Sequence, residues 1–146
     1  MDTRRLPLAI AALWILASGC TSGAARFAEP LPGSRLGEMK RFYVQHQEGD
    51  PRDIHLDIRD ELRHFGFEVD AGSGAPSGDY DAIVTYRDRY VWDMTMFCER
   101  LTVYFTDTST GFITATGWSW RPSTVRKTPK GHARLIFTEL FGGGAP

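Results

Sequence analysis

The chain has 146 residues, and its 17 basic side chains nearly balance 18 acidic ones. This length is enough for one compact domain with a single core and too short for two. A protein that neutralises nucleic-acid phosphates needs a marked basic excess or a basic stripe, which this composition lacks, so we expect no nucleic-acid partner.

Residues 1–19 have the organisation of a secretory signal. Two basic residues, Arg4 and Arg5, precede an apolar run over residues 6–16, and small residues fill positions 17–19. Eleven helical residues extend only about 16 Å, short of the roughly 30 Å hydrocarbon core, so a permanent membrane span is not expected. The pattern predicts a signal peptide that is removed.

The sequence Leu16-Ala17-Ser18-Gly19-Cys20 resembles the lipobox of bacterial lipoproteins, with Ala17 where leucine is most common. The resemblance implies that the Cys20 thiol carries diacylglycerol, that its freed amine is acylated, for example with palmitate, and that the protein is membrane-anchored in the bacterial cell envelope. Thr21, in place of an aspartate, indicates the outer membrane facing the periplasm if the source is Gram-negative. The alternative is an ordinary signal peptide with a chance cysteine.

The mature chain divides into three predicted parts. Residues 20–38 are rich in Ala, Gly, Pro and Ser and predict a flexible tether from the lipidated cysteine. Residues 39–141 are expected to form a single domain, and residues 142–146 a disordered tail. Cys98 would be the remaining cysteine, and its place in a strand-like run indicates a small buried hydrophobic residue rather than a nucleophile.

The first half of the domain predicts a strand, a helix and a second strand. Residues 41–45 form a strand candidate, and residues 52–65 place apolar side chains on one helical face, with Asp50 as a cap and Gly66 as a stop. Residues 67–69 resume as a strand. A right-handed crossover would make the two strands parallel.

The second half predicts three strands and a closing helix. Apolar and polar residues alternate over 82–87 and 100–106, and the second run is joined by a hairpin loop to a strand over 112–120. A basic connector over 121–130 leads to a helix over 133–141. The expected fold is α+β: a mostly antiparallel four- to five-stranded sheet with two helices packed on one face.

Charged and aromatic residues are densest in residues 86–93, Tyr-Arg-Asp-Arg-Tyr-Val-Trp-Asp. Together with residues 41–44, 66–69 and 117–121, this run resembles a group of uncharacterised bacterial lipoproteins related to the DUF4136-type domains. The likeness spans about residues 38–141. It implies a small α+β envelope lipoprotein without an assigned reaction and implies no catalytic residue.

Three interpretations of this run stay open. It can be an ion-paired exposed strand, although each exposed pair contributes only about 0–1 kcal/mol. It can be a recognition surface, because Tyr, Trp and Arg dominate interface hot spots. It can also be a catalytic or ligand-binding cleft that uses Asp81, Asp88 or Asp93 with His132. The candidate recognition surface consists of Tyr86, Arg87, Asp88, Arg89, Trp92, Asp93 and Trp118.

The remaining candidate residues do not predict a catalytic or metal-binding site. His46, His55 and His64 recur every nine residues, which is not a metal-ligand spacing, so we expect solvated histidines, no metal and no cofactor. The sequence therefore predicts an envelope lipoprotein that is not an enzyme and has a structural or protein-binding role. The alternative is a small-ligand-binding or hydrolytic envelope protein that uses the strand from Arg87 to Asp93. The partner, the oligomeric state and the physiological process stay open.

Overall fold

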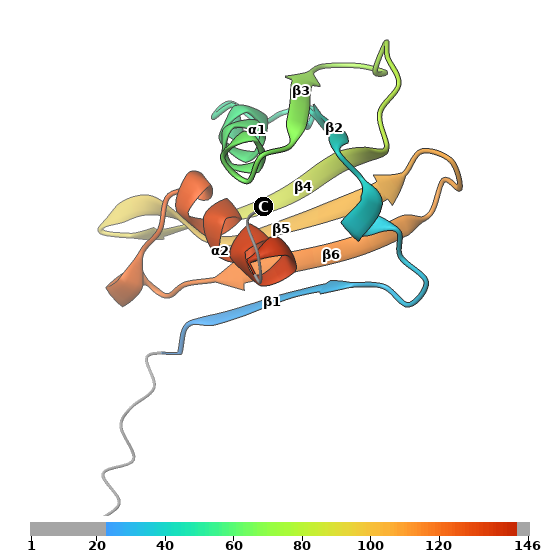
Figure 1. The fold of residues 1–146 in the computed structure, drawn as a ribbon. Coiled ribbons are helices and arrows are strands. Elements are labelled where there is room, and N and C mark those ends of the chain that lie inside the picture. The colour runs from blue at the N-terminus through green and yellow to red at the C-terminus, as the bar shows by residue number, and fades with distance from the viewer. Residues whose placement is uncertain (1–22, 143–146) are drawn as a thin grey trace, which may run out of the picture.

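The computed structural model describes residues 23–142, so the predicted signal peptide, Cys20 and the last four residues of the predicted tail lie outside the described residues. Six strands form one sheet, and two α-helices pack on one of its faces (Figure 1). The elements are β1 (Ala25–Pro30), a 3₁₀ turn (Leu36–Glu38), β2 (Arg41–Gln45), α1 (Ile54–His64), β3 (Glu68–Gly72), β4 (Ala82–Asp93), β5 (Thr95–Asp107), β6 (Ile113–Trp120), a second 3₁₀ turn (Ser123–Val125) and α2 (Pro129–Phe141).

The sheet is mixed, with strand order β1-β6-β5-β4-β2-β3. The pairs β1–β6, β6–β5 and β5–β4 are antiparallel, whereas β2 is parallel to both β4 and β3. The α+β class and the parallel β2–α1–β3 crossover are confirmed. The predicted count of four to five strands is too low, and the sheet is less antiparallel than expected.

The additional strand is β1, which the sequence placed in the flexible tether. Each residue of β1 has a partner in β6, from Ala25 opposite Trp120 to Pro30 opposite Ala115. The following turn buries Leu36 and Met39 in the core. The predicted boundary between residues 38 and 39 is therefore wrong, because residues 25–38 are part of the domain.

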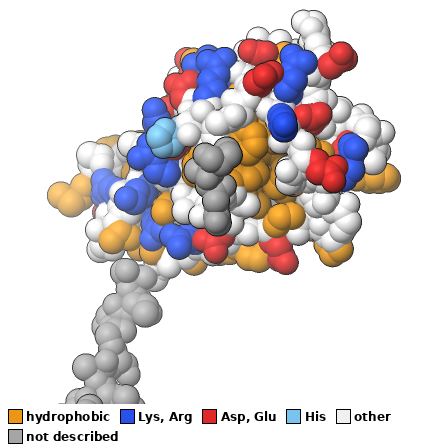
Figure 2. Space-filling model, in the orientation of Figure 1, with side chains coloured by type: hydrophobic (Ala, Val, Ile, Leu, Met, Phe, Trp, Pro, Cys, Tyr) orange, Lys and Arg blue, Asp and Glu red, His pale blue; other side chains and the backbone are white. Residues whose placement is uncertain are grey.

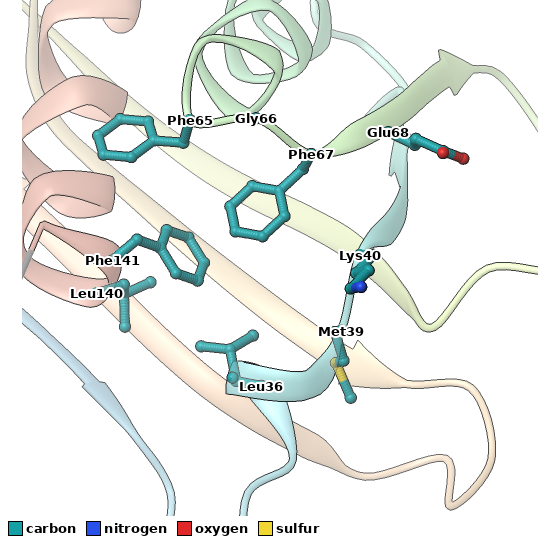
Figure 3. Close-up of a pocket in the computed structure, with 10 residues that line it drawn as sticks. Leu36, Met39, Lys40, Phe65, Gly66, Phe67, Glu68, Leu140 and Phe141 are labelled. Carbon is teal, nitrogen blue, oxygen red and sulfur yellow. The ribbon is translucent and has the colours of Figure 1, made fainter. Parts of the chain in front are cut away.

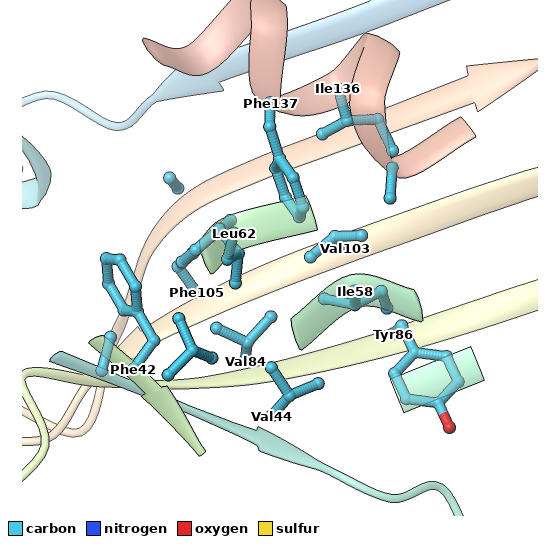
Figure 4. Packing of buried hydrophobic residues seen from close by; sticks show 14 of the residues in the cluster. Phe42, Val44, Ile58, Leu62, Val84, Tyr86, Val103, Phe105, Ile136 and Phe137 are labelled. Atoms are coloured by element: carbon cyan, nitrogen blue, oxygen red, sulfur yellow. The ribbon is translucent and has the colours of Figure 1, made fainter. Parts of the chain in front are cut away.

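The core lies between the sheet and the two helices. The predicted alternation is confirmed: Val84 and Tyr86 in β4, and Val103 and Phe105 in β5, point to the helices and are buried. Aromatic rings join the layers, since Phe105 packs edge-on against both Phe42 and a ring of α2. Figure 4 shows this cluster, in which the labelled side chains of both helices and three strands point toward one another. The opposite face of the sheet, which we call the open face, is not covered by α1 or α2 (Figure 1).

The two helices begin at different residues from those predicted. Asp53 occupies the cap position of α1, but the Asp50 carboxylate provides the expected capping contacts, because it accepts hydrogen bonds from the amides of Arg52 and Ile54, both at 2.8 Å. The α-helix itself starts at Ile54, two residues later than predicted. In α2 the Thr128 side chain accepts from the amide of Gly131, so that helix starts four residues earlier, inside the predicted connector.

Within residues 23–142, no helix is both long and apolar enough to cross a membrane.

Candidate functional site

Three exposed apolar side chains lie together at the tip of the β4–β5 hairpin. Trp92 is 73% exposed and Met94 is 86% exposed, and Met96 follows at 50%. Met94 forms the turn with a positive φ of 59°, a conformation that few non-glycine residues adopt. Large apolar side chains displayed together on a projecting turn are typical of a surface that contacts another molecule or a membrane.

The chain enters the domain at this same end of the sheet. Ala25, the first residue of β1, lies opposite Trp120 of β6, which in turn lies opposite Arg100 of β5. From that row, β5 extends five residues further, about 17 Å, to its first residue Thr95 at the hairpin tip. Figure 1 shows the start of β1 and the hairpin tip on the same side of the molecule.

Basic side chains surround the hairpin. The Arg126 guanidinium lies 4.6 Å from the centre of the Phe97 ring and donates to the Thr95 hydroxyl and the Asp93 carbonyl. Arg52 stacks on the Tyr90 ring at 3.8 Å. Figure 2 shows Lys and Arg side chains gathered on the half of the helical face toward the hairpin tip. This end therefore combines an apolar tip with arginine side chains, of which Arg126 also forms an ion pair with Asp93 at 3.6 Å.

The seven residues of the predicted recognition surface do not form one surface, because strand alternation divides them. Tyr86 and Asp88 lie on the helix-covered face, and Arg87 and Arg89 lie on the open face. The other two residues of β4, Trp92 and Asp93, lie at the hairpin tip.

Tyr86 is 3% exposed, so its assignment to an exposed surface is wrong. Its hydroxyl donates to the Asp50 carboxylate at 2.7 Å and accepts from the amide of Gln47 at 3.2 Å. Burial raises the pKa of Tyr86. Burial also acts to raise the pKa of Asp50, but the hydrogen bonds from Tyr86 and from the amides of Arg52 and Ile54 outweigh it and lower that pKa. Tyr86 therefore supports the start of α1.

Arg87 and Trp118 belong to one row across the open face. The register pairs Arg87 with Thr102, Thr102 with Trp118, and Trp118 with Phe27. The Phe27 and Trp118 rings stack at 6.4 Å, and the Arg100 guanidinium lies 5.2 Å from the centre of the Trp118 ring. Because the row is laid across a sheet face, these side chains do not converge on a point.

The residues considered for a catalytic cleft have other partners. Asp81 accepts hydrogen bonds from the amides of Lys40 and Arg41, which lower its pKa. His132 is fully buried, and its two ring nitrogens lie 3.0 Å from the Ser119 hydroxyl and from the Cys98 carbonyl. Burial lowers the pKa of His132. Asp81 and His132 are therefore held by contacts within the fold.

Cys98 is buried, as predicted. It is 2% exposed, and its thiol contacts the Arg100 carbonyl at 3.4 Å. Burial raises the pKa of the thiol to about 12, so the reactive thiolate form is disfavoured at neutral pH.

One concavity of the described residues lies away from the charged strand. It has a volume of about 640 Å³ and opens between the end of α1, the end of α2 and the first 3₁₀ turn. Figure 3 shows the rings of Phe67 and Phe141 and the side chain of Leu36 pointing toward one another there, while the Phe65 ring points toward α2. A second hollow of about 490 Å³ includes Arg87 and lies along β4.

His46 and His55, which are nine residues apart in the sequence, lie side by side in the structure. The loop after β2 folds back onto the start of α1, so the ring centres of His46 and His55 are 4.6 Å apart. His55 is 7% exposed, which overturns the expectation of a solvated side chain. Burial and the neighbouring His46 lower the pKa of His55. Only tertiary contacts bring the pair together, and no local sequence signal marks it.

No protein-family model matches the sequence, and neither does any curated protein. Solved structures share the fold. A PelC dodecamer from Paraburkholderia phytofirmans has 12% identity and a TM-score of 0.56, and covers 80% of this chain and 96% of its own. A dodecamer of a point variant of that protein has 11% identity and a TM-score of 0.55, with 80% and 95% covered.

A minor lipoprotein from Acinetobacter baumannii has 16% identity and a TM-score of 0.29, and covers 60% of this chain and 74% of its own. This score is too low to show a shared fold. The PelC structures establish the likeness of fold, because their scores exceed 0.5 over most of both chains. No match supports the DUF4136-type resemblance, which stays a prediction.

Proposed function

We propose that this protein is a lipid-anchored, non-catalytic protein of the bacterial envelope that holds its hairpin end against the membrane and presents the rest of its surface to a protein partner. The observation that carries this proposal is that the start of β1 and the apolar hairpin tip lie at the same end of the sheet. Cys20 precedes Ala25 by five residues, which reach at most about 18 Å when extended. A lipid on Cys20 would therefore hold this end of the sheet close to the bilayer.

The hairpin has the composition of a membrane-contacting element. Its tip extends about 17 Å beyond the start of β1, a length comparable with the reach of the Cys20 segment. Trp92 is amphipathic and suits the interface between headgroups and acyl chains. Arg89 is exposed and pairs with Glu99 at 3.1 Å, and Arg126 pairs with Asp93 at 3.6 Å, so lipid phosphates would compete with these carboxylates for the two guanidinium groups.

The opposite end of the sheet then faces away from the membrane. It carries a second exposed apolar group, in which Phe112 is 77%, Ile113 46% and Leu31 41% exposed. The open face adds the stacked rings of Phe27 and Trp118. Since the two PelC structures with the same fold are dodecamers, we propose that the partner is another copy of this chain.

The experiment that tests this function begins with metabolic labelling of cells by a radioactive or alkyne-tagged palmitate. We expect label on the wild-type chain, recovery in the membrane fraction, and loss of both in Cys20→Ala. Cross-linking in intact cells followed by gel electrophoresis should then give a ladder of multiples of this chain. Unlabelled, soluble wild-type protein would contradict the anchor, and a strictly monomeric cross-linked product would contradict self-assembly.

A second candidate function is binding of a small apolar ligand in the cavity next to Phe67. Its volume of about 640 Å³ falls within the usual range for ligand sites, and its lining is mainly apolar. A fluorescent fatty-acid analogue should bind the wild type and bind less well to Phe67→Ser. Equal binding by both proteins would remove this candidate.

A further inference from the structure

Three side chains with metal-binding atoms meet where the loop after β2 reaches α1. His46 follows the last residue of β2, Asp53 directly precedes α1, and His55 lies in the first turn of the helix. One possible ligand atom from each residue lies within 4.8 Å of the other two. Two imidazole nitrogens and a carboxylate oxygen form a common protein ligand set for Zn²⁺.

One of these side chains, His55, has a buried ring nitrogen that is not hydrogen-bonded to any described residue. The Nδ1 atom of His55 is buried and has no hydrogen-bond partner among the described residues. Buried polar atoms in folded proteins are nearly always paired, and an unpaired one calls for an explanation such as a bound ion. A metal ion bound by His55 supplies that explanation.

His46 is already held in the form that a ligand requires. Its Nε2 lies 3.2 Å from the carbonyl oxygen of Asp50. A carbonyl can only accept, so Nε2 carries the proton and Nδ1 keeps its lone pair. Metal-bound histidines usually donate their second ring nitrogen to a carbonyl or carboxylate in this way, which fixes the tautomer and the ring orientation.

The Asp53 carboxylate is not used by the helix that it precedes. Asp53 occupies the cap position, but its side chain makes no capping hydrogen bond, because the Asp50 carboxylate accepts from Arg52 and Ile54 instead. Asp53 is exposed, so its carboxylate can rotate toward the histidines. Ligand atoms around tetrahedral Zn²⁺ are about 3.3 Å apart, so closure from 4.8 Å needs a movement of roughly 1.5 Å.

We propose that His46, Asp53 and His55 bind one divalent transition-metal ion, with Zn²⁺ as the first choice, and leave a fourth coordination position for water or a partner's side chain. The ion would tie the loop after β2 to the start of α1. This site includes no residue of the β4–β5 hairpin and does not depend on the proposed membrane role.

The test uses the full chain, purified in detergent without a histidine tag and treated with a chelator. Titration with ZnCl₂ is followed by calorimetry, and titration with CoCl₂ by the visible absorption of tetrahedral cobalt. We expect one ion per chain, a cobalt spectrum typical of mixed nitrogen and oxygen ligands, and a higher melting temperature with Zn²⁺.

Two variants test the ligands without removing the buried histidine. Asp53→Asn keeps a residue that tolerates the left-handed backbone at this position, and His46→Gln replaces a half-buried side chain. Each should weaken Zn²⁺ binding by at least about tenfold. His64→Gln, an exposed histidine at the end of α1, is the matched control and should bind as the wild type does. Absence of stoichiometric binding, or equal binding by all three variants, would overturn the proposal.

Discussion

The Tyr86 hydroxyl donates a 2.7 Å hydrogen bond to the Asp50 carboxylate, which joins the middle of β4 to the cap of α1 across 36 residues of sequence. The same carboxylate accepts from the amides of Arg52 and Ile54, so one side chain fixes both the helix start and its position on the sheet. The buried phenol therefore has a structural role.

Tyr86→Phe should lower the free energy of unfolding by about 1–3 kcal/mol, because a buried carboxylate loses a charge-assisted hydrogen bond. Urea denaturation followed by circular dichroism measures the change. Tyr104→Phe, on the open face, is the control and should change stability little. If both variants unfold at the same urea concentration as the wild type, the proposed role of this hydrogen bond is wrong.

Gly117→Ala should destabilise the contact between β1, β6 and α2. A Cβ at this position would lie 2.5 Å from a methyl carbon of Ile136 and 2.8 Å from the Cβ of Ala28. Overpacking of this kind lowers the free energy of unfolding by about 1–3 kcal/mol. Thermal unfolding followed by circular dichroism should therefore show a lower midpoint for this variant. Gly37→Ala, where no atom lies within 4 Å of the added Cβ, should leave the midpoint nearly unchanged.

The folded protein should lose stability as the pH falls below about 6.5 because His132 stays neutral in the core. Burial lowers the pKa of His132 from 6.5, and the charges of Arg121 and Lys127 act in the same direction. Below pH 6.5 the unfolded chain binds a proton that the folded chain does not, so the stability contribution is complete above this pH and declines as the pH falls.

Denaturant unfolding at several pH values between 5 and 7.5 measures this dependence. One such group gives a slope of at most about 1.4 kcal/mol per pH unit, and His55, whose pKa is also lowered, adds to it. His132→Gln should give a shallower slope, whereas His64→Gln should keep the wild-type slope. A slope unchanged in His132→Gln would show that His132 does not titrate as argued.

The combined replacement of Trp92 and Met94 by serine should leave stability unchanged, because both side chains are mostly exposed. It should weaken binding of the unlipidated Cys20→Ala protein to vesicles of phosphatidylglycerol and phosphatidylethanolamine, measured by cosedimentation. Phe112→Ser, at the other end of the sheet, is the matched control. An equal loss with Phe112→Ser would count against a specific role of the hairpin tip.

The strands with clear alternation of apolar and polar residues could be predicted from the sequence. A strand that forms only because it pairs with a distant part of the chain could not. Alternation in β4 and β5 correctly placed Val84, Tyr86 and Val103 on one face, because a sheet covered on one side needs that pattern. The segment Ala25–Pro30 has weak alternation and ends in proline, so β1 forms through pairing with β6 rather than through its own propensity.

The candidate sites were harder to predict than the fold. The density of charge and aromatic rings around Arg87 suggested one recognition surface, but alternation distributes these side chains over two faces and a hairpin tip. The approach of His46 to His55 depends on how a loop folds back on a helix, which a spacing of nine residues does not encode.

The central claim is that the hairpin end of the sheet lies against the membrane, and a measurement of the hairpin's orientation in a bilayer tests it most directly. A nitroxide spin label is placed on Met94→Cys or on Thr110→Cys in the lipidated chain, reconstituted in bilayers; Cys98 is buried and should not react. Collision with oxygen and with a water-soluble nickel chelate is then compared by electron paramagnetic resonance. We expect the label at residue 94 to be accessible to oxygen and protected from nickel, and the label at residue 110 to show the reverse. Equal exposure of both labels to nickel would contradict the account.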